Sequence, residues 1–283
     1  RYLELSPHQG VQFAYFIHDD HILAYSAMMV GRESVAMETA RRMWEIVPEE
    51  QLEQLAPWID PWMCSIYDVQ KRFGRWDAML EEPAPPASLP YTTAMWHAHR
   101  AVSFAAKGGL ATDPAEKDRC FAEAAKEHAK YREVVADFPP EVVRAGDTLE
   151  EVLARLAVID LFVPGEIALQ KGNLEEAIAL LRKSVDAEDA LSYGGEPPEY
   201  LQPIRHTLGA VYLKAGRFAE AEKVFREDQA EFPGNGWSLD GLVRALDGQQ
   251  KNEEADRLRE QLKAVWAKAD HTPTSPCLCI PDP

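Results

Sequence analysis

The stretch that decides the fold is residues 205–233, RHTLGAVYLKAGRFAEAEKVFREDQAEFP. Apolar and small residues recur in it at intervals of three and four, which is the period of an α-helix. Gly209 and Ala221 are small enough to let two helices cross closely. Gly216 ends the first helix, because glycine readily adopts the left-handed conformation of a helix C-terminus, and Pro233 stops the second. The stretch therefore predicts a packed pair of helices.

Residues that could end a first helix recur along the chain. They are Gly31, Gly74, Gly108, Gly172 and Gly216, with Gln250 in the equivalent place at the end. Two of the five spacings are 34 residues and three are longer, which indicates a repeat with insertions. We assign the extra residues to Pro- and Gly-rich loops at 51–61 and 192–203 and to an additional helix within 117–136.

The deciding stretch resembles the tetratricopeptide repeat (TPR), whose pattern is W-x-x-L-G-x-x-Y…A-x-x-x-F…P, with Arg205 in place of the opening Trp. The first unit carries His18-Asp-Asp-His21 and Met28-Met29-x-Gly31-Arg32. This combination resembles a largely uncharacterised branch of bacterial TPR proteins with His-x-x-His in the first repeat. The resemblance implies an all-α fold, a right-handed α-α superhelix of about six helix pairs with loop insertions over residues 1–270. Residues 271–283 form a Pro- and Cys-containing tail.

In TPR proteins the first helix of each pair lines a concave groove. The resemblance therefore implies a set of groove residues spaced three or four apart on each first helix. They are His18, His21, Tyr25, Met28, Asp68, Lys71, Glu166, His206, Trp237, Asp240 and Arg244. Two aromatic-bearing segments, at 57–62 and 196–200, are expected as rigid loops at the lip of this groove or as anchors for the insertions.

His18 and His21 are three residues apart, so both imidazoles can address one point. Such a pair is a common half of a transition-metal site, and Asp19 or Asp20 could orient a ring. The alternatives are recognition of an organic ligand or peptide, and a structural role near the start of a helix, where aspartates favour the helix dipole.

Cys277 and Cys279 lie in the tail after the last helix. A C-x-C pair can bind a soft metal such as Zn or Cu, form a disulfide, or have no role. The candidate metal ligands are thus His18, His21, Cys277 and Cys279. The other two cysteines, at 64 and 120, are expected to be buried apolar residues.

The composition narrows the class of partner. The chain has 47 acidic and 30 basic residues and a net charge of −17, which disfavours nucleic acid and anionic lipid and favours a neutral or basic partner. No apolar run is long enough to span a bilayer, so a soluble protein is expected. The chain begins at Arg1 without a recognisable leader, which leaves a cytoplasmic or an exported, processed protein open.

The leading hypothesis is a protein–protein interaction or scaffold module that binds a peptide or a partner subunit in its groove. The alternative is a protein that binds a metal or a small molecule through groove histidines. The sequence has no nucleophile elbow, phosphate-binding loop or dinucleotide fingerprint, so an enzyme is the less favoured interpretation.

Overall fold

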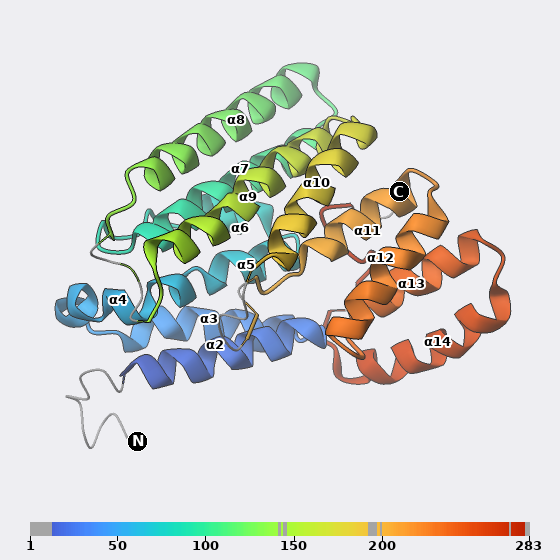
Figure 1. Cartoon of the computed structure of the whole chain (residues 1–283), viewed down its shortest axis with the longest axis horizontal. Coiled ribbons are helices and arrows are strands. Elements are labelled where there is room, and N and C mark those ends of the chain that lie inside the picture. The colour runs from blue at the N-terminus through green and yellow to red at the C-terminus, as the bar shows by residue number, and fades with distance from the viewer. Residues whose placement is uncertain are drawn as a thin grey trace.

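The computed structural model describes residues 13–140, 143, 146–191, 197–198, 200–271 and 273–280 (Figure 1). All regular secondary structure within these residues is helical, and they contain no strand. The all-α prediction is confirmed. None of the helices in the described part of the chain is both long and apolar enough to cross a membrane.

The helices pack as neighbouring pairs, each pair also contacting the next. In chain order the pairs are α2 (Phe13–Met29) with α3 (Glu33–Ile46), α5 (Ser65–Arg72) with α6 (Trp76–Glu81), α7 (Pro90–Leu110) with α8 (Pro114–Ala136), α9 (Leu149–Gln170) with α10 (Leu174–Asp189), α11 (Ile204–Lys214) with α12 (Phe218–Glu231), and α13 (Gly236–Gly248) with α14 (Asn252–Val265). The remaining helix, α4 (Leu52–Met63), packs against α2 and α7. Two short 3₁₀ turns, Glu49–Gln51 and Trp266–Lys268, extend the helices beside them.

Five of the inter-helix turns share one geometry. A residue with positive φ ends the first helix at Gly31, Gly74, Gly172, Gly216 and Gln250. At Gly216 the backbone N–H donates to the carbonyl of Leu213 at 3.0 Å, and the next N–H, of Arg217, donates to Tyr212 at 2.9 Å. The same two hydrogen bonds recur at the other four turns. These hydrogen bonds satisfy the last carbonyls of the first helix. They require a positive φ at the turn residue, which explains why glycine recurs at four of the five positions.

Gly108 does not end a helix. It lies inside α7, which continues to Leu110. A Cβ at this position would lie 3.2 Å from atoms of Cys120 and Phe121 on α8, so Gly108 permits a close approach of two helices and makes no turn. The helix expected within 117–136 is α8 itself, the partner of α7 and not an insertion.

Residues 51–61 were expected to form a loop and instead form most of α4, although Pro57 and Pro61 lie inside that helix. The two prolines remove N–H groups that would form helical hydrogen bonds, but the burial of one face of the helix outweighs this loss. The residues of that face are Leu55, Ala56, Ile59, Asp60 and Met63. The expected rigid aromatic loop at 57–62 is therefore also helical. In the second predicted loop, residues 197–198 and 200–203 lie outside helices, and the others, including 192–196 and 199, lie outside the described residues.

The last helix pair and the residues after it touch the C-terminal end of α2 and the turn that follows it. The indole N–H of Trp237 on α13 donates to the carbonyl of Met28 on α2 at 2.9 Å. The backbone N–H groups of Asp270 and His271 both donate to the carbonyl of Gly31, at 3.2 and 3.1 Å. Figure 1 shows α13 and α14 beside the C-terminal end of α2. The two ends of the described helical array are thus joined directly.

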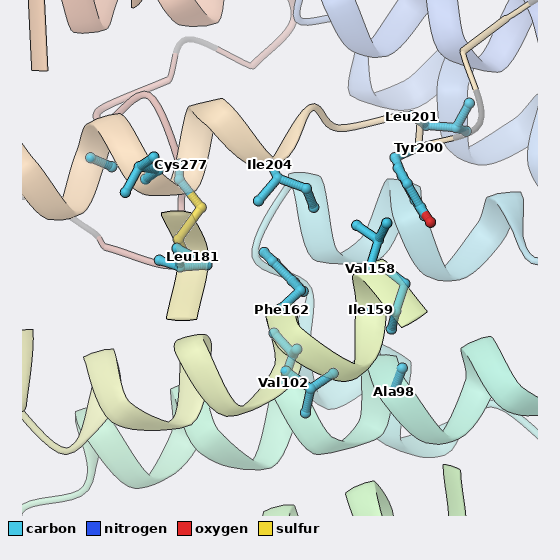
Figure 2. Packing of buried hydrophobic residues seen from close by; sticks show 14 of the residues in the cluster. Ala98, Val102, Val158, Ile159, Phe162, Leu181, Tyr200, Leu201, Ile204 and Cys277 are labelled. Atoms are coloured by element: carbon cyan, nitrogen blue, oxygen red, sulfur yellow. A yellow bond between two sulfur atoms is a disulfide. The ribbon is translucent and has the colours of Figure 1, made fainter. Parts of the chain in front are cut away.

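The tail beyond α14 lies inside the molecule. Cys277 and Cys279 are each 3% exposed and belong to the main apolar core. Both helices of each pair contribute to that core. Within it, Phe162 of α9 lies between Val102 of α7 and Ile204 of α11 (Figure 2). Residues 273–280 therefore belong to the folded core, although the sequence suggested a separate tail.

The closest packing in the fifth pair is between Gly209 and the ring of Phe225. A Cβ at Gly209 would lie 2.3 Å from that ring, so Gly209→Ala is expected to lower the free energy of unfolding by about 1–3 kcal/mol. Urea unfolding monitored by circular dichroism measures the change. Adding Phe225→Leu should recover part of the stability lost by the alanine, because the two side chains compete for one space.

Gly216→Asn is the matched control, since its Cβ would meet nothing within 4 Å and asparagine tolerates positive φ. A Gly209→Ala chain as stable as the unsubstituted one would contradict this account of the crossing.

Candidate functional site

The residues predicted to line the groove are mostly buried. His21, Met28, Asp68, Lys71, Glu166, His206, Trp237 and Asp240 are each at most 9% exposed, and His18, Tyr25 and Arg244 are partly buried. These side chains lie between packed helix pairs, so charged and polar groups are concentrated inside the fold.

His18 and His21 lie against Trp62 of α4, with ring centroids 5.3 and 6.1 Å from it. The neighbouring Asp20 does not orient either ring through any described contact, because its carboxylate binds the guanidinium of Arg42 on α3. Neither histidine lies with the tail cysteines. The four candidate metal ligands are therefore two separate groups.

His206 is fully buried and its Nε2 lies 3.0 Å from the carboxylate of Asp228 on α12. The side-chain amide of Asn235 donates to the same carboxylate at 2.8 Å. Burial alone would raise the pKa of Asp228, but the charge and hydrogen bond of His206 outweigh it and hold that pKa below its usual value. Burial lowers the pKa of His206. His206 thus joins α11 to the α12–α13 turn and does not converge with His18 or His21.

Arg72 is buried against Trp237, with its guanidinium carbon 3.4 Å from the ring centroid. Within the described residues none of its three guanidinium nitrogens has a hydrogen-bond partner. Stacking on an aromatic face is the main contact that stabilises this cation. This contact could not be predicted from the sequence, because the charged residues of α5 predict a solvent-facing side and all eight of its residues are buried.

Lys71, one residue earlier, is the centre of a second buried charged group. Its ammonium lies 4.4 Å from the Phe162 ring centroid, and burial lowers its pKa. Burial raises the pKa of Glu166 on α9 to about 7, although the charge of Lys71 opposes that shift. Nearby, Asp68 is bound at 3.0 Å by Nε2 of His99. Acidic and basic side chains thus face each other in the interior.

Cys277 and Cys279 form a disulfide beside this charged group. Both sulfurs and a Glu166 carboxylate oxygen lie within 4.8 Å of one another. The Cys277 sulfur is 3.5 Å from the Gln202 amide nitrogen and 3.5 Å from the Thr207 hydroxyl. That hydroxyl is also 3.4 Å from Glu166. Because the metal-binding form of cysteine is the thiolate, the disulfide offers an ion no sulfur ligand, and the expected Zn or Cu site stays a prediction.

The tail segment is held by its backbone as well. The side-chain amide of Gln170 donates to the carbonyl of Cys279 at 2.7 Å, and the guanidinium of Arg244 donates to that of Thr274 at 2.6 Å. Gln170, Gln202 and Thr207 were not identified from the sequence. No pattern in the sequence predicts that a glutamine side chain will form a hydrogen bond with a segment more than seventy residues away.

Two spaces adjoin these groups. A small cavity of about 10 Å³, bordered by Asp68, Lys71, His99 and Gln202, has room for a single water. A much larger cleft of about 670 Å³ lies between the ends of α7, α9 and α11 and the tail, with Cys279 in its wall. This cleft is large enough for a small molecule or a short segment of chain.

Comparison of the chain with protein-family models, with curated proteins and with solved structures finds no match. The argument for function therefore depends on the site itself.

The raised pKa of Glu166 makes stability depend on pH. A carboxyl whose pKa is about 7 when folded and near 4.5 when unfolded stabilises the fold below pH 4.5, and this contribution is lost as the pH rises through 7. Glu166→Gln removes the titration, so the variant should gain up to about 3 kcal/mol over the unsubstituted chain at pH 8 and little at pH 5. Urea unfolding at a series of pH values measures this difference.

Glu175→Gln, at an exposed position on α10, is the control and should leave the pH profile unchanged. Asp60 and Glu188, whose pKa values burial raises to about 6 and about 8, add slopes of the same sign to both profiles. Parallel profiles for Glu166→Gln and the unsubstituted chain would contradict the assignment.

Proposed function

We propose that this chain is a TPR-like protein-interaction module, a tightly curled superhelix that binds an extended segment of a partner protein in the cleft beside its own tail. The paired helices and the repeated turn geometry support the superhelical arrangement. The proposal keeps the interaction function expected from the sequence. It moves the binding surface from the buried groove residues to the cleft.

The observation that carries the proposal is the way the helices already hold a non-helical segment of chain. Gln170 on α9 and Arg244 on α13 donate side-chain hydrogen bonds to tail carbonyls. Contacts of this kind bind the backbone of a segment whatever its sequence. Both residues also line the cleft, so the same kind of contact is available to a second segment lying beside the tail.

The lining of the cleft indicates the chemistry of the partner. Its ionisable side chains within the described residues are Lys214 and Arg244, and carboxylates are missing from its lining. Its apolar part includes Leu110, which is 58% exposed, together with Leu213 and Phe218. A neutral or acidic segment with apolar anchors fits this surface better than the basic segment that the net charge suggested.

Binding of a metal or small molecule by the groove histidines has weaker support. His18 and His21 pack against Trp62, His206 is engaged by Asp228, and the internal cavity holds no more than one water. The open cleft is of the size typical of ligand-binding sites, which lie between about 300 and 1,000 Å³.

The full chain should select acidic, apolar-containing peptides from a random displayed library. Lys214→Glu should weaken the binding of a selected peptide at least about tenfold, equivalent to 1.4 kcal/mol, and added salt should weaken binding to the unsubstituted chain. Fluorescence anisotropy with the labelled peptide measures both effects.

Lys263→Glu on α14 makes the same charge change away from the cleft and is the control. Equal loss of affinity in the two variants would mean that binding responds to the net charge of the chain and not to Lys214 in the cleft. Peptides that bind Lys214→Glu as well as the unsubstituted chain would contradict the proposed site.

A further inference from the structure

The disulfide lies beside the large cleft, and one of its two residues borders that cleft. Cys279 is among the lining residues, together with Gln170, Ser275 and Pro276, although its exposed fraction is only 3%. Cys277, which is buried to the same extent, is not among them and contacts the polar side chains of Gln202 and Thr207. The two sulfurs therefore have different surroundings although a single residue separates them.

We propose that Cys277 and Cys279 form a thiol–disulfide exchange site, which oxidises thiols that enter the cleft. The substrate class is a small thiol, or a pair of cysteines on an extended segment. The proposal does not depend on the binding of a partner protein, because a small thiol can reach the cleft wall alone.

The surroundings assign a role to each sulfur. Cys279 is the sulfur that is attacked, because it borders the cleft. Cys277 is the leaving sulfur, because the Gln202 amide and the Thr207 hydroxyl, both 3.5 Å from it, can donate hydrogen bonds to a developing thiolate. Thiol–disulfide exchange is faster when the leaving thiolate is stabilised, so this arrangement favours one direction of attack.

Glu166 and Thr207 supply a proton path to the leaving sulfur. The Thr207 hydroxyl lies between a Glu166 carboxyl oxygen, at 3.4 Å, and the Cys277 sulfur, at 3.5 Å. The other carboxyl oxygen of Glu166 is buried and has no hydrogen-bond partner within the described residues. Burial holds the pKa of this carboxyl near 7, so it carries its proton in mildly acidic solution and can release it when a thiolate forms.

The exchange balances in two steps. A substrate thiolate attacks Cys279 Sγ, the S–S bond breaks, and its electron pair passes to Cys277 Sγ, which receives a proton from Glu166 through Thr207. A second substrate thiolate then attacks the substrate sulfur of the mixed disulfide and releases the Cys279 thiolate. Two substrate thiols are oxidised to one disulfide, and the Cys277–Cys279 disulfide is reduced to two thiols.

The charges facing Glu166 belong to several elements. Lys71 on α5 favours the ionised carboxylate, and Lys71 is itself influenced by Asp68, Arg72 and Glu188. The tail contributes the two sulfurs. A pH profile of the native protein therefore reports on this whole group, and the role of the carboxyl must be read from the difference between matched variants.

The first test asks which sulfur reacts. In a Cys64→Ala, Cys120→Ala background, which removes the two buried cysteines that form no disulfide, Cys277→Ser leaves Cys279 and Cys279→Ser leaves Cys277. Each folded variant is incubated with oxidised glutathione and the mixed disulfide is measured by mass spectrometry. We expect the Cys277→Ser variant to react at least about tenfold faster. Equal rates, or no reaction in either variant, would overturn the proposal.

The second test addresses the proton path. The disulfide of the full chain is reduced with dithiothreitol from pH 5.5 to 8.5. At each pH the rate of the native protein is divided by the rate of the variant. The ionisation of dithiothreitol affects both rates equally and therefore does not change this ratio. Glu166→Gln and Thr207→Val should each slow reduction about tenfold or more below pH 7, with the ratio falling toward one above it. The double variant should be no slower than either single variant, since both substitutions break one path.

A purely structural role predicts another outcome. If the substitutions act only by loosening the fold, the rate ratios will follow the measured loss of stability and will not change with pH. Reduction of the native disulfide only at the rate of global unfolding would likewise refute an exchange site open to the cleft.

Discussion

The contact between the segment that follows the last helix pair and the turn at Gly31 joins the two ends of the described helical array. The carbonyl of Gly31 accepts two backbone hydrogen bonds from residues 270 and 271, and a Cβ at this glycine would lie 2.9 Å from the carbonyl oxygen of His271. Gly31 must therefore be a glycine both for its positive φ and for this close approach. Because the two ends of the array meet here, the side chains that would line an open groove are enclosed.

Enclosure explains the unusual number of buried charges. Lys71, Arg72, Glu166 and Asp228 are each less than one-tenth exposed, and only some of their polar atoms have partners within the described residues. Burying such groups generally gives little net stability, because desolvation opposes the attraction between opposite charges. Glu166 is the one of these four groups that lies beside the two tail cysteines, where a buried ionisable group is a candidate for a chemical role.

The parts of the fold that leave a local residue signature could be predicted from the sequence. Gly74 and Gly216 mark turns because a positive φ selects glycine, and Gly209 marks a crossing because no side chain fits there. The prediction of a turn at Gly108 was wrong, because the close packing of α7 against α8 also selects glycine at a position where there is no turn. The closure, the helix through Pro57 and the course of the tail could not be predicted, because they depend on contacts between residues far apart in sequence. Histidine spacing alone likewise could not show that Trp62 covers His18 and His21.

The tail can contribute both backbone and sulfur to the cleft because it is not helical. Pro273 and Pro276 lack the N–H groups that a helix requires, so the carbonyls of the tail have no partners in a helix of their own. Side chains of the surrounding helices take that place, with Gln170 bound to Cys279 and Arg244 to Thr274. This anchoring fixes the Cys279 sulfur in the cleft wall and keeps the Cys277 sulfur beside Thr207. The prolines, which in the sequence mark residues 271–283 as a tail outside the helices, are therefore the reason why this segment can carry a site.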